Sequence, residues 1–185
     1  MMILKHILLL LVFLSINAYA IVGATKGSAD VAQGSFTYDI EIITPKGVSG
    51  LQPSLKLNYN SSNSVNSIFG VGFSISGLSS ITKCNESLFS EKEETSRNYN
   101  YCLDGQKLLL VDSAAEYGSD NSEYKTEINN HSKIVKTSSG WKVHSKDGLI
   151  HKYGNTADSN DGEVFYKISK ISDRYDNAID FIYAS

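Results

Sequence analysis

The sequence has few cysteines, few prolines and little net charge, and these shortages exclude several classes of protein. Its 185 residues include two cysteines, which by themselves cannot make a structural zinc site. The formal net charge is -3, which argues against a basic nucleic-acid surface and against a highly charged disordered chain. Proline occurs only 2 times, whereas the 11 tyrosines and many small polar residues are typical of strands joined by turns.

After the N-terminus, the chain has no apolar run long enough to span a membrane. At the N-terminus itself, Lys5 and His6 precede an apolar run that ends near Ile16. The sequence Ala-Tyr-Ala then ends at Ala20 and matches a signal-peptidase site. A membrane anchor is the alternative, but a span needs ~20 apolar residues and this run is shorter. We therefore expect residues 1–20 to be a helical signal peptide and the mature chain to be secreted through the periplasm.

Export changes the interpretation of the two cysteines, Cys84 and Cys102. In an oxidising compartment they are expected to form a disulfide, with two free buried thiols as the alternative. The disulfide would close a loop around the polar segment NESLFSEKEETSRNYNY, and a loop of that length contributes ~3 kcal/mol in the chain-entropy model.

The mature chain has a period of two almost throughout. Residues 21–33 are small and polar and predict a flexible lead-in. The segment FTYDIEI then alternates apolar and polar residues, and LKLNYN repeats the pattern after a turn. Later turn signals include Asp147-Gly148 and Asp176-Asn177. The pattern predicts an all-β fold of many short antiparallel strands, forming a sheet, a sandwich or a fragment of a shell wall.

The glycine-rich segment FGVGFSISGLSSITKC has two possible interpretations, a phosphate-binding turn or a tightly packed strand. A dinucleotide fingerprint would need glycine where Ile75 stands, and no P-loop lysine follows. Small residues at alternate positions instead leave one strand face bare, so that another backbone can approach. We therefore predict a packing role and no cofactor for the following residues: Phe69, Gly70, Val71, Gly72, Phe73 and Ile75.

Several segments occur in an order that resembles a known family. They are GSFTYDIEIITPKGVSGLQPSLKLNYNSS, FGVGFSISGLSSITKC, YCLDGQKLLLVD, EYGSDNSEYKTEI and KDGLIHKYG. From about Gln33 to Tyr183 the chain is similar to the N-terminal region of SpvB-type proteins. This region is shared with the B component of insecticidal toxin complexes and with Rhs/YD-repeat toxins.

The resemblance implies a domain organisation. Residues 34–170 would be an SpvB-like β domain, and residues 171–185 would begin a YD repeat that is then truncated. The family usually has tryptophan at Phe73, arginine at Lys83 and Lys107, and glycine at Asp176. Aspartate tolerates the left-handed conformation expected at Asp176.

In the family, this region is part of a β-rich shell that encloses a C-terminal toxic domain. Some members carry an ADP-ribosyltransferase there, but no such domain is present in this sequence, so no catalytic residue is carried over. The expected partners are downstream Rhs/YD-repeat shell or toxin-complex subunits, with no nucleic acid and no small-molecule substrate. We expect either a truncated gene product or a chain that assembles with another.

The sequence contains little evidence for a catalytic site or a metal site. No G-x-S-x-G elbow accompanies the histidines, and both His144 and His151 are expected on solvated faces. The acidic segment Asp158–Glu163 fails the EF-hand spacing and predicts a solvated turn.

An alternative function is a free-standing adhesin that binds glycans through exposed rings. The competing interpretation is that most of these rings are half-buried strand residues. The candidate rings are Tyr99, Tyr101, Trp141, Tyr153 and Tyr166.

Overall fold

The structure is a computed structural model that describes residues 26–32, 34–84, 99–162 and 164–184. The predicted signal peptide and its cleavage site at Ala20 lie outside the described residues, as does most of the lead-in. The prediction of an all-β fold is confirmed, since the described chain contains only strands and one short 3-10 turn, η1 at Val48–Gly50.

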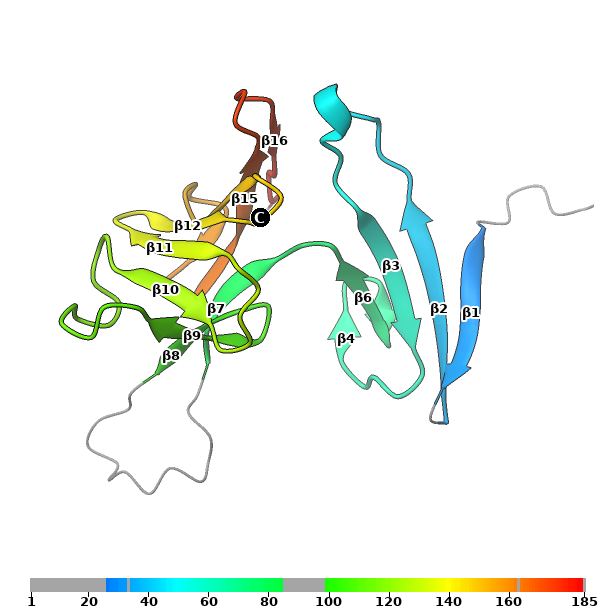
Figure 1. The fold of residues 1–185 in the computed structure, drawn as a ribbon. Helices are drawn as coiled ribbons and strands as arrows, with labels where there is room; N and C mark the ends of the chain where they lie inside the picture. The colour runs from blue at the N-terminus through cyan, green and yellow to red at the C-terminus, as the bar shows by residue number, and fades with distance from the viewer. Residues whose placement is uncertain (1–25, 33, 85–98, 163, 185) are drawn as a thin grey trace, which may run out of the picture.

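The N-terminal part of the structure is a four-stranded antiparallel sheet with the order β1-β2-β3-β6 (Figure 1). Strands β4 and β5 form a separate two-stranded ribbon in the connection between β3 and β6. The strands are β1 (Gly27–Ala32), β2 (Ser35–Ile42), β3 (Leu55–Asn60), β4 (Asn66–Ser67), β5 (Gly70–Val71) and β6 (Phe73–Ser76).

The second part is a closed eight-stranded antiparallel barrel. Strands β7 to β13 follow one another as a meander, and β15 pairs with both β13 and β7, which closes the ring. The ring strands are β7 (Ser80–Cys84), β8 (Asn100–Leu103), β9 (Gln106–Leu110), β10 (Glu123–Thr126), β11 (Lys133–Thr137), β12 (Gly140–His144), β13 (Ile150–Tyr153) and β15 (Phe165–Ser172). Two short strands, β14 (Asn160–Asp161) and β16 (Ala178–Asp180), pair with β15 beside the ring.

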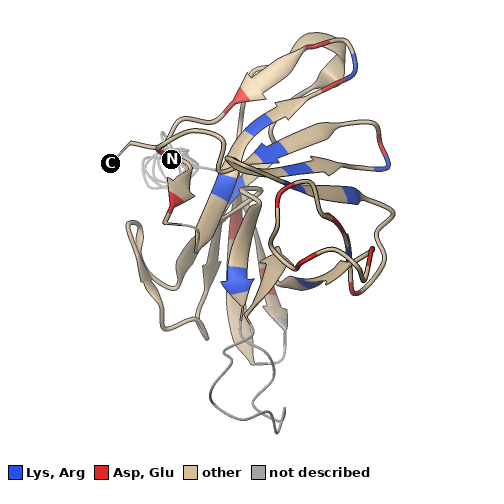
Figure 2. Cartoon of the chain, turned by 90° about the vertical axis from the view of Figure 1, so that its left-hand side faces the viewer, with Lys and Arg blue, Asp and Glu red and all other residues tan. Residues whose placement is uncertain are grey.

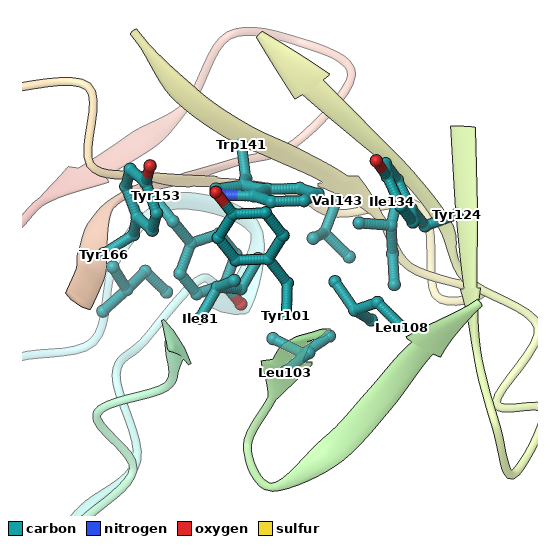
Figure 3. Packing of buried hydrophobic residues seen from close by; sticks show 11 residues of the cluster. Ile81, Tyr101, Leu103, Leu108, Tyr124, Ile134, Trp141, Val143, Tyr153 and Tyr166 are labelled. Carbon is teal, nitrogen blue, oxygen red and sulfur yellow. The ribbon is translucent and has the colours of Figure 1, made fainter. Parts of the chain in front are cut away.

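The hydrophobic core lies inside this barrel (Figure 3). Alternate residues of each ring strand point inward, and eight strands enclose a space that side chains just fill. Trp141 is fully buried at the centre, and its ring meets Tyr101 and Tyr124 edge-on at centroid distances of 4.7 and 5.2 Å. The other core residues are Ile81, Leu103, Leu108, Ile134, Val143, Tyr153, Tyr166 and Ile168.

The sheet and the barrel are joined by the three residues Gly77–Ser79, between β6 and β7. The sequence predicts a domain limit at residue 170, and strand β15 continues past it to Ser172. The predicted domains 34–170 and 171–185 stay a prediction. The turn after β15 has the expected geometry, because Asp176 adopts φ +64°, the left-handed conformation.

Candidate functional site

The glycine-rich segment forms strands, and Gly72 lies where two backbones come close. Its φ is +85°, and a Cβ atom there would be 2.8 Å from Tyr59 Cε2 and 2.9 Å from the Asn60 carbonyl oxygen. The Asn60 amide donates a hydrogen bond to the Gly72 carbonyl oxygen at 2.9 Å. Glycine is therefore required at this position both by backbone conformation and by the close approach of β3.

The same glycine divides the predicted apolar stripe between two structures. Phe69 precedes the ribbon strand β5, which contains Val71, and both side chains are exposed. Phe73 and Ile75 belong to β6 in the main sheet, where the Phe73 ring lies 5.0 Å from that of Tyr59. The stripe thus consists of two short segments rather than one continuous strand.

One face of the four-stranded sheet is apolar. Residues paired across antiparallel strands share a face, and the register places Tyr38 opposite Tyr59, and Tyr59 opposite Phe73. We call the following set the apolar face: Phe36, Tyr38, Ile40, Ile42, Leu55, Leu57, Tyr59, Phe73 and Ile75. The opposite face is polar and carries Asp39, Glu41 and Asn58 among others.

No layer covers this apolar face in the described residues. Between residues 26 and 76, Gly72 is the only described residue that is buried, and Phe36 and Ile42 are 42% and 38% exposed. The partly buried residues that pack on the barrel core all come from the barrel part of the chain: Leu110, Tyr117, Ile171 and Phe181. A sheet of this size with one apolar face is expected to need a second layer.

The predicted disulfide between Cys84 and Cys102 is present. It joins the end of β7 to β8, with the Cα atoms 5.9 Å apart, and Cys102 is buried. It lies at the base of the polar loop between the two strands, and residues 85–98 of that loop lie outside the described residues. The link fixes the first two strands of the barrel at the point where their pairing ends.

Among the described residues, Lys136 of β11 is the one buried cation of the barrel interior. Its side chain faces inward, with the ammonium 5.7 Å from the Trp141 ring centroid and 5.8 Å from that of Tyr166. The ammonium donates a hydrogen bond to the Thr137 carbonyl oxygen at 2.7 Å and lies 3.9 Å from an Asp120 carboxylate oxygen. These contacts compensate the burial of the charge, so we interpret Lys136 as a structural residue.

Burial overturns most of the predicted glycan-binding surface. Tyr101, Trp141, Tyr153 and Tyr166 are core residues of the barrel, and only Tyr99 is exposed. The sequence left both interpretations open, because alternation shows that a strand has two faces but does not show which face lies inside a barrel.

The two expected solvated histidines behave differently. His144 faces outward as predicted, since it alternates with the buried Val143. The prediction that His151 lies on a solvated face is wrong. His151 pairs with Val143 and Ile171 across the strands, and its Nε2 atom is buried without a hydrogen-bond partner in the described chain. Burial lowers the pKa of His151 although Asp147 and Asp104 oppose the shift.

Among the described residues, neither of these histidine side chains is hydrogen-bonded to a serine. Two carboxylate–serine pairs lie in this region. The Ser145 hydroxyl donates to Asp147, and the Ser79 hydroxyl donates to the Asp104 carboxylate at 2.6 Å and lies 2.9 Å from the Tyr153 hydroxyl oxygen. The second Asp104 oxygen accepts the Ser80 amide at 2.9 Å. This arrangement fixes the chain where it enters the barrel, and the serine contacts a carboxylate rather than an imidazole.

Asp158, the first residue of the acidic segment, has a structural partner. An Asp158 carboxylate oxygen accepts the Tyr183 amide at 2.8 Å, and this hydrogen bond lowers the pKa of Asp158. Across the described ranges, no three metal-binding side chains come together.

The comparison with protein families gives one match. Residues 30–89 fit the family model SpvB, described as Salmonella virulence plasmid 65kDa B protein. Over these residues the chain is similar to the SpvB family, and the match covers about a third of its length. The SpvB segment covers most of the four-stranded sheet and continues through β7 to the first half of the disulfide. No curated protein and no solved structure matches the chain.

The SpvB match suggests a protein related to virulence toxins. It also assigns the family to the part of the structure that has the uncovered apolar face. No helix in the described ranges is long and apolar enough to cross a bilayer.

Proposed function

We propose that this chain is a secreted, non-enzymatic structural module of a Tc/Rhs-type toxin. Its role is to form part of a β-rich shell that encloses or delivers a C-terminal toxic domain. Its partners in this role are a downstream Rhs/YD-repeat shell or toxin-complex subunits.

The observation that carries the proposal is the uncovered apolar face of the SpvB segment. Aromatic and aliphatic side chains of three neighbouring strands lie there in register, and the described residues of the sheet form no buried core. An antiparallel sheet with one apolar face is stable when that face packs against another layer. A shell wall built of β-sheets would supply that layer.

The barrel supports the same role. Its ring of strands is closed, so each ring strand has a paired neighbour on both sides. Its interior is filled with aromatic and aliphatic side chains. A closed, filled barrel is a rigid block rather than a ligand container. The disulfide agrees with secretion, because such bonds persist in oxidising compartments.

The proposal is tested by co-purifying the whole chain with a YD-repeat shell protein encoded in the same genome. Ile75→Asp places a charge on the apolar face, whereas Ser74→Asp places the same charge on the polar face one residue away. We expect Ile75→Asp to weaken co-purification at least tenfold, because an unpaired carboxylate would be buried in the interface. Ser74→Asp should retain it.

Two results would contradict the proposal. One is unchanged association of the Ile75→Asp variant when its barrel melts normally. The other is transfer of ADP-ribose from labelled nicotinamide cofactor to host proteins by the purified chain.

A further inference from the structure

Three lysines form a line across the outer wall of the barrel, and we call them the lysine row: Lys142 of β12, Lys152 of β13 and Lys170 of β15. The register places Lys142 directly opposite Lys152, and Lys152 directly opposite Lys170. Each alternates with inward-facing residues, so the row lies on the outer surface. Figure 2, which colours lysine and arginine blue, shows basic residues on neighbouring strands.

This arrangement is unfavourable in the isolated chain. Like charges directly opposite one another on adjacent strands destabilise a sheet. Lys170 has a partial counter-charge, since its ammonium lies 3.2 Å from an Asp180 carboxylate oxygen. Lys142 and Lys152 have no ion pair or hydrogen bond from their ammonium groups in the part of the chain that the structure describes.

The positive charge of one lysine of the row, Lys142, also lowers the pKa of a neighbouring histidine, His144. The pKa of His144 is lowered first by partial burial and then by the positive charges of Lys142 and Lys133. Since Lys142 and Lys152 have no counter-charge among the described residues, this part of the wall is locally positive although the whole chain has a net charge of -3.

The row is short, and acidic residues lie beyond both of its ends. Beyond Lys170 the next residue in register is Asp180, and beyond Lys142 the register continues through Val135 to Glu123. Two strand spacings make the row about 10 Å long. A membrane surface or a nucleic-acid duplex is wider than this and would also meet the flanking carboxylates. The geometry favours a narrow anionic partner.

An extended acidic peptide has suitable dimensions. Residues i and i+2 of a β-strand point to the same side and lie about 6.6 Å apart, so two such carboxylates span most of the row. We propose that the lysine row docks an extended segment of a partner protein that carries acidic residues at alternate positions. The row lies on the barrel and not on the apolar face, so this inference is independent of the proposed function.

The test is fluorescence anisotropy at low ionic strength with the whole chain. The probe is a labelled octapeptide of alternating threonine and glutamate, compared with the same peptide containing glutamine. We expect the Lys142→Gln/Lys152→Gln variant to bind the glutamate peptide about tenfold more weakly than the unmodified chain. The control is Lys46→Gln/Lys125→Gln, which changes the net charge equally at two exposed lysines outside the row and should bind normally.

Thermal melts separate lost binding from lost folding. Because the row variant removes a repulsion, its melting temperature should stay the same or rise by about 1–4 °C. Absence of glutamate-peptide binding, or equal loss in the control, would overturn the proposal. The proposal would also be wrong if anionic vesicles or duplex DNA bind the row more tightly than the peptide does, or if the row instead mediates self-association of the chain.

Discussion

Tyr117 is the residue that best illustrates how one side chain completes the barrel. The pairing of Cys102 with Lys107 and of Leu103 with Gln106 would next bring Tyr101 opposite Leu108. Instead, the Tyr101 amide donates to the Tyr117 hydroxyl oxygen at 2.8 Å, and that hydroxyl donates to the Leu108 carbonyl oxygen at 3.1 Å. A side chain from the loop after β9 thus bridges two backbone groups of β8 and β9.

We expect Tyr117→Phe to destabilise the chain by about 1–3 kcal/mol, because a buried amide and a carbonyl lose their common partner. Urea unfolding followed by fluorescence measures this change. The control is Tyr175→Phe, which removes a hydroxyl from a residue that is 73% exposed and should leave stability unchanged. Equal effects of the two substitutions would contradict the bridging role of Tyr117.

The same phenol predicts sensitivity to alkaline pH. Burial raises the pKa of Tyr117 to about 12, against 10.0 for a free tyrosine. The folded state therefore holds this proton more tightly than the unfolded state, so its contribution is complete below pH 10 and is lost as pH rises to about 12. The urea midpoint should fall across this interval, and it should fall less steeply in Tyr117→Phe. A midpoint independent of pH between 10 and 12 would contradict the prediction.

At the scale of elements, the disulfide stabilises the β7–β8 pair. Cys84 and Cys102 are separated by 18 positions, and closing a loop of that length contributes ~3 kcal/mol in the chain-entropy model. We expect reductant, or Cys84→Ser with Cys102→Ser, to lower the free energy of unfolding by about that amount. Reductant should have no effect on the double-serine variant. An unchanged urea midpoint after complete reduction would contradict this prediction.

The sequence predicts the strands better than it predicts their arrangement. Alternation identified FTYDIEI and LKLNYN as half-buried strands, and turn residues such as Gly148 marked a hairpin. Barrel closure depends on the pairing of β15 with β7, which are more than 80 positions apart, and no local pattern encodes that contact. For the same reason, the burial of Tyr101 and Trp141 could not be predicted from alternation.

The two candidate surfaces also differ in how far the sequence predicts them. The apolar face follows from the sequence, because its members occur at alternate positions of recognisable strands. The lysine row does not, because its three lysines come from three strands and become neighbours only through the register of β12, β13 and β15. The role of Tyr117 was also hidden, since a loop tyrosine carries no signal that its hydroxyl will bridge two strands.

At the scale of the whole molecule, the two parts differ in how complete they are. The barrel contains the entire buried hydrophobic cluster and closes on itself. The four-stranded sheet, which carries most of the SpvB segment, has in-register apolar side chains, but its described residues form no buried core. This contrast is the basis of the proposal that the sheet completes its fold against a partner layer.

Carbene footprinting of the free, monomeric chain tests this claim most directly. The label should react strongly with Phe36 and Ile42 of the apolar face and weakly with Leu108 inside the barrel, which is fully buried. Addition of a YD-repeat shell protein should then protect the two face residues and leave Leu108 unchanged. The claim would be contradicted if Phe36 and Ile42 are already as protected as Leu108 in the free monomer.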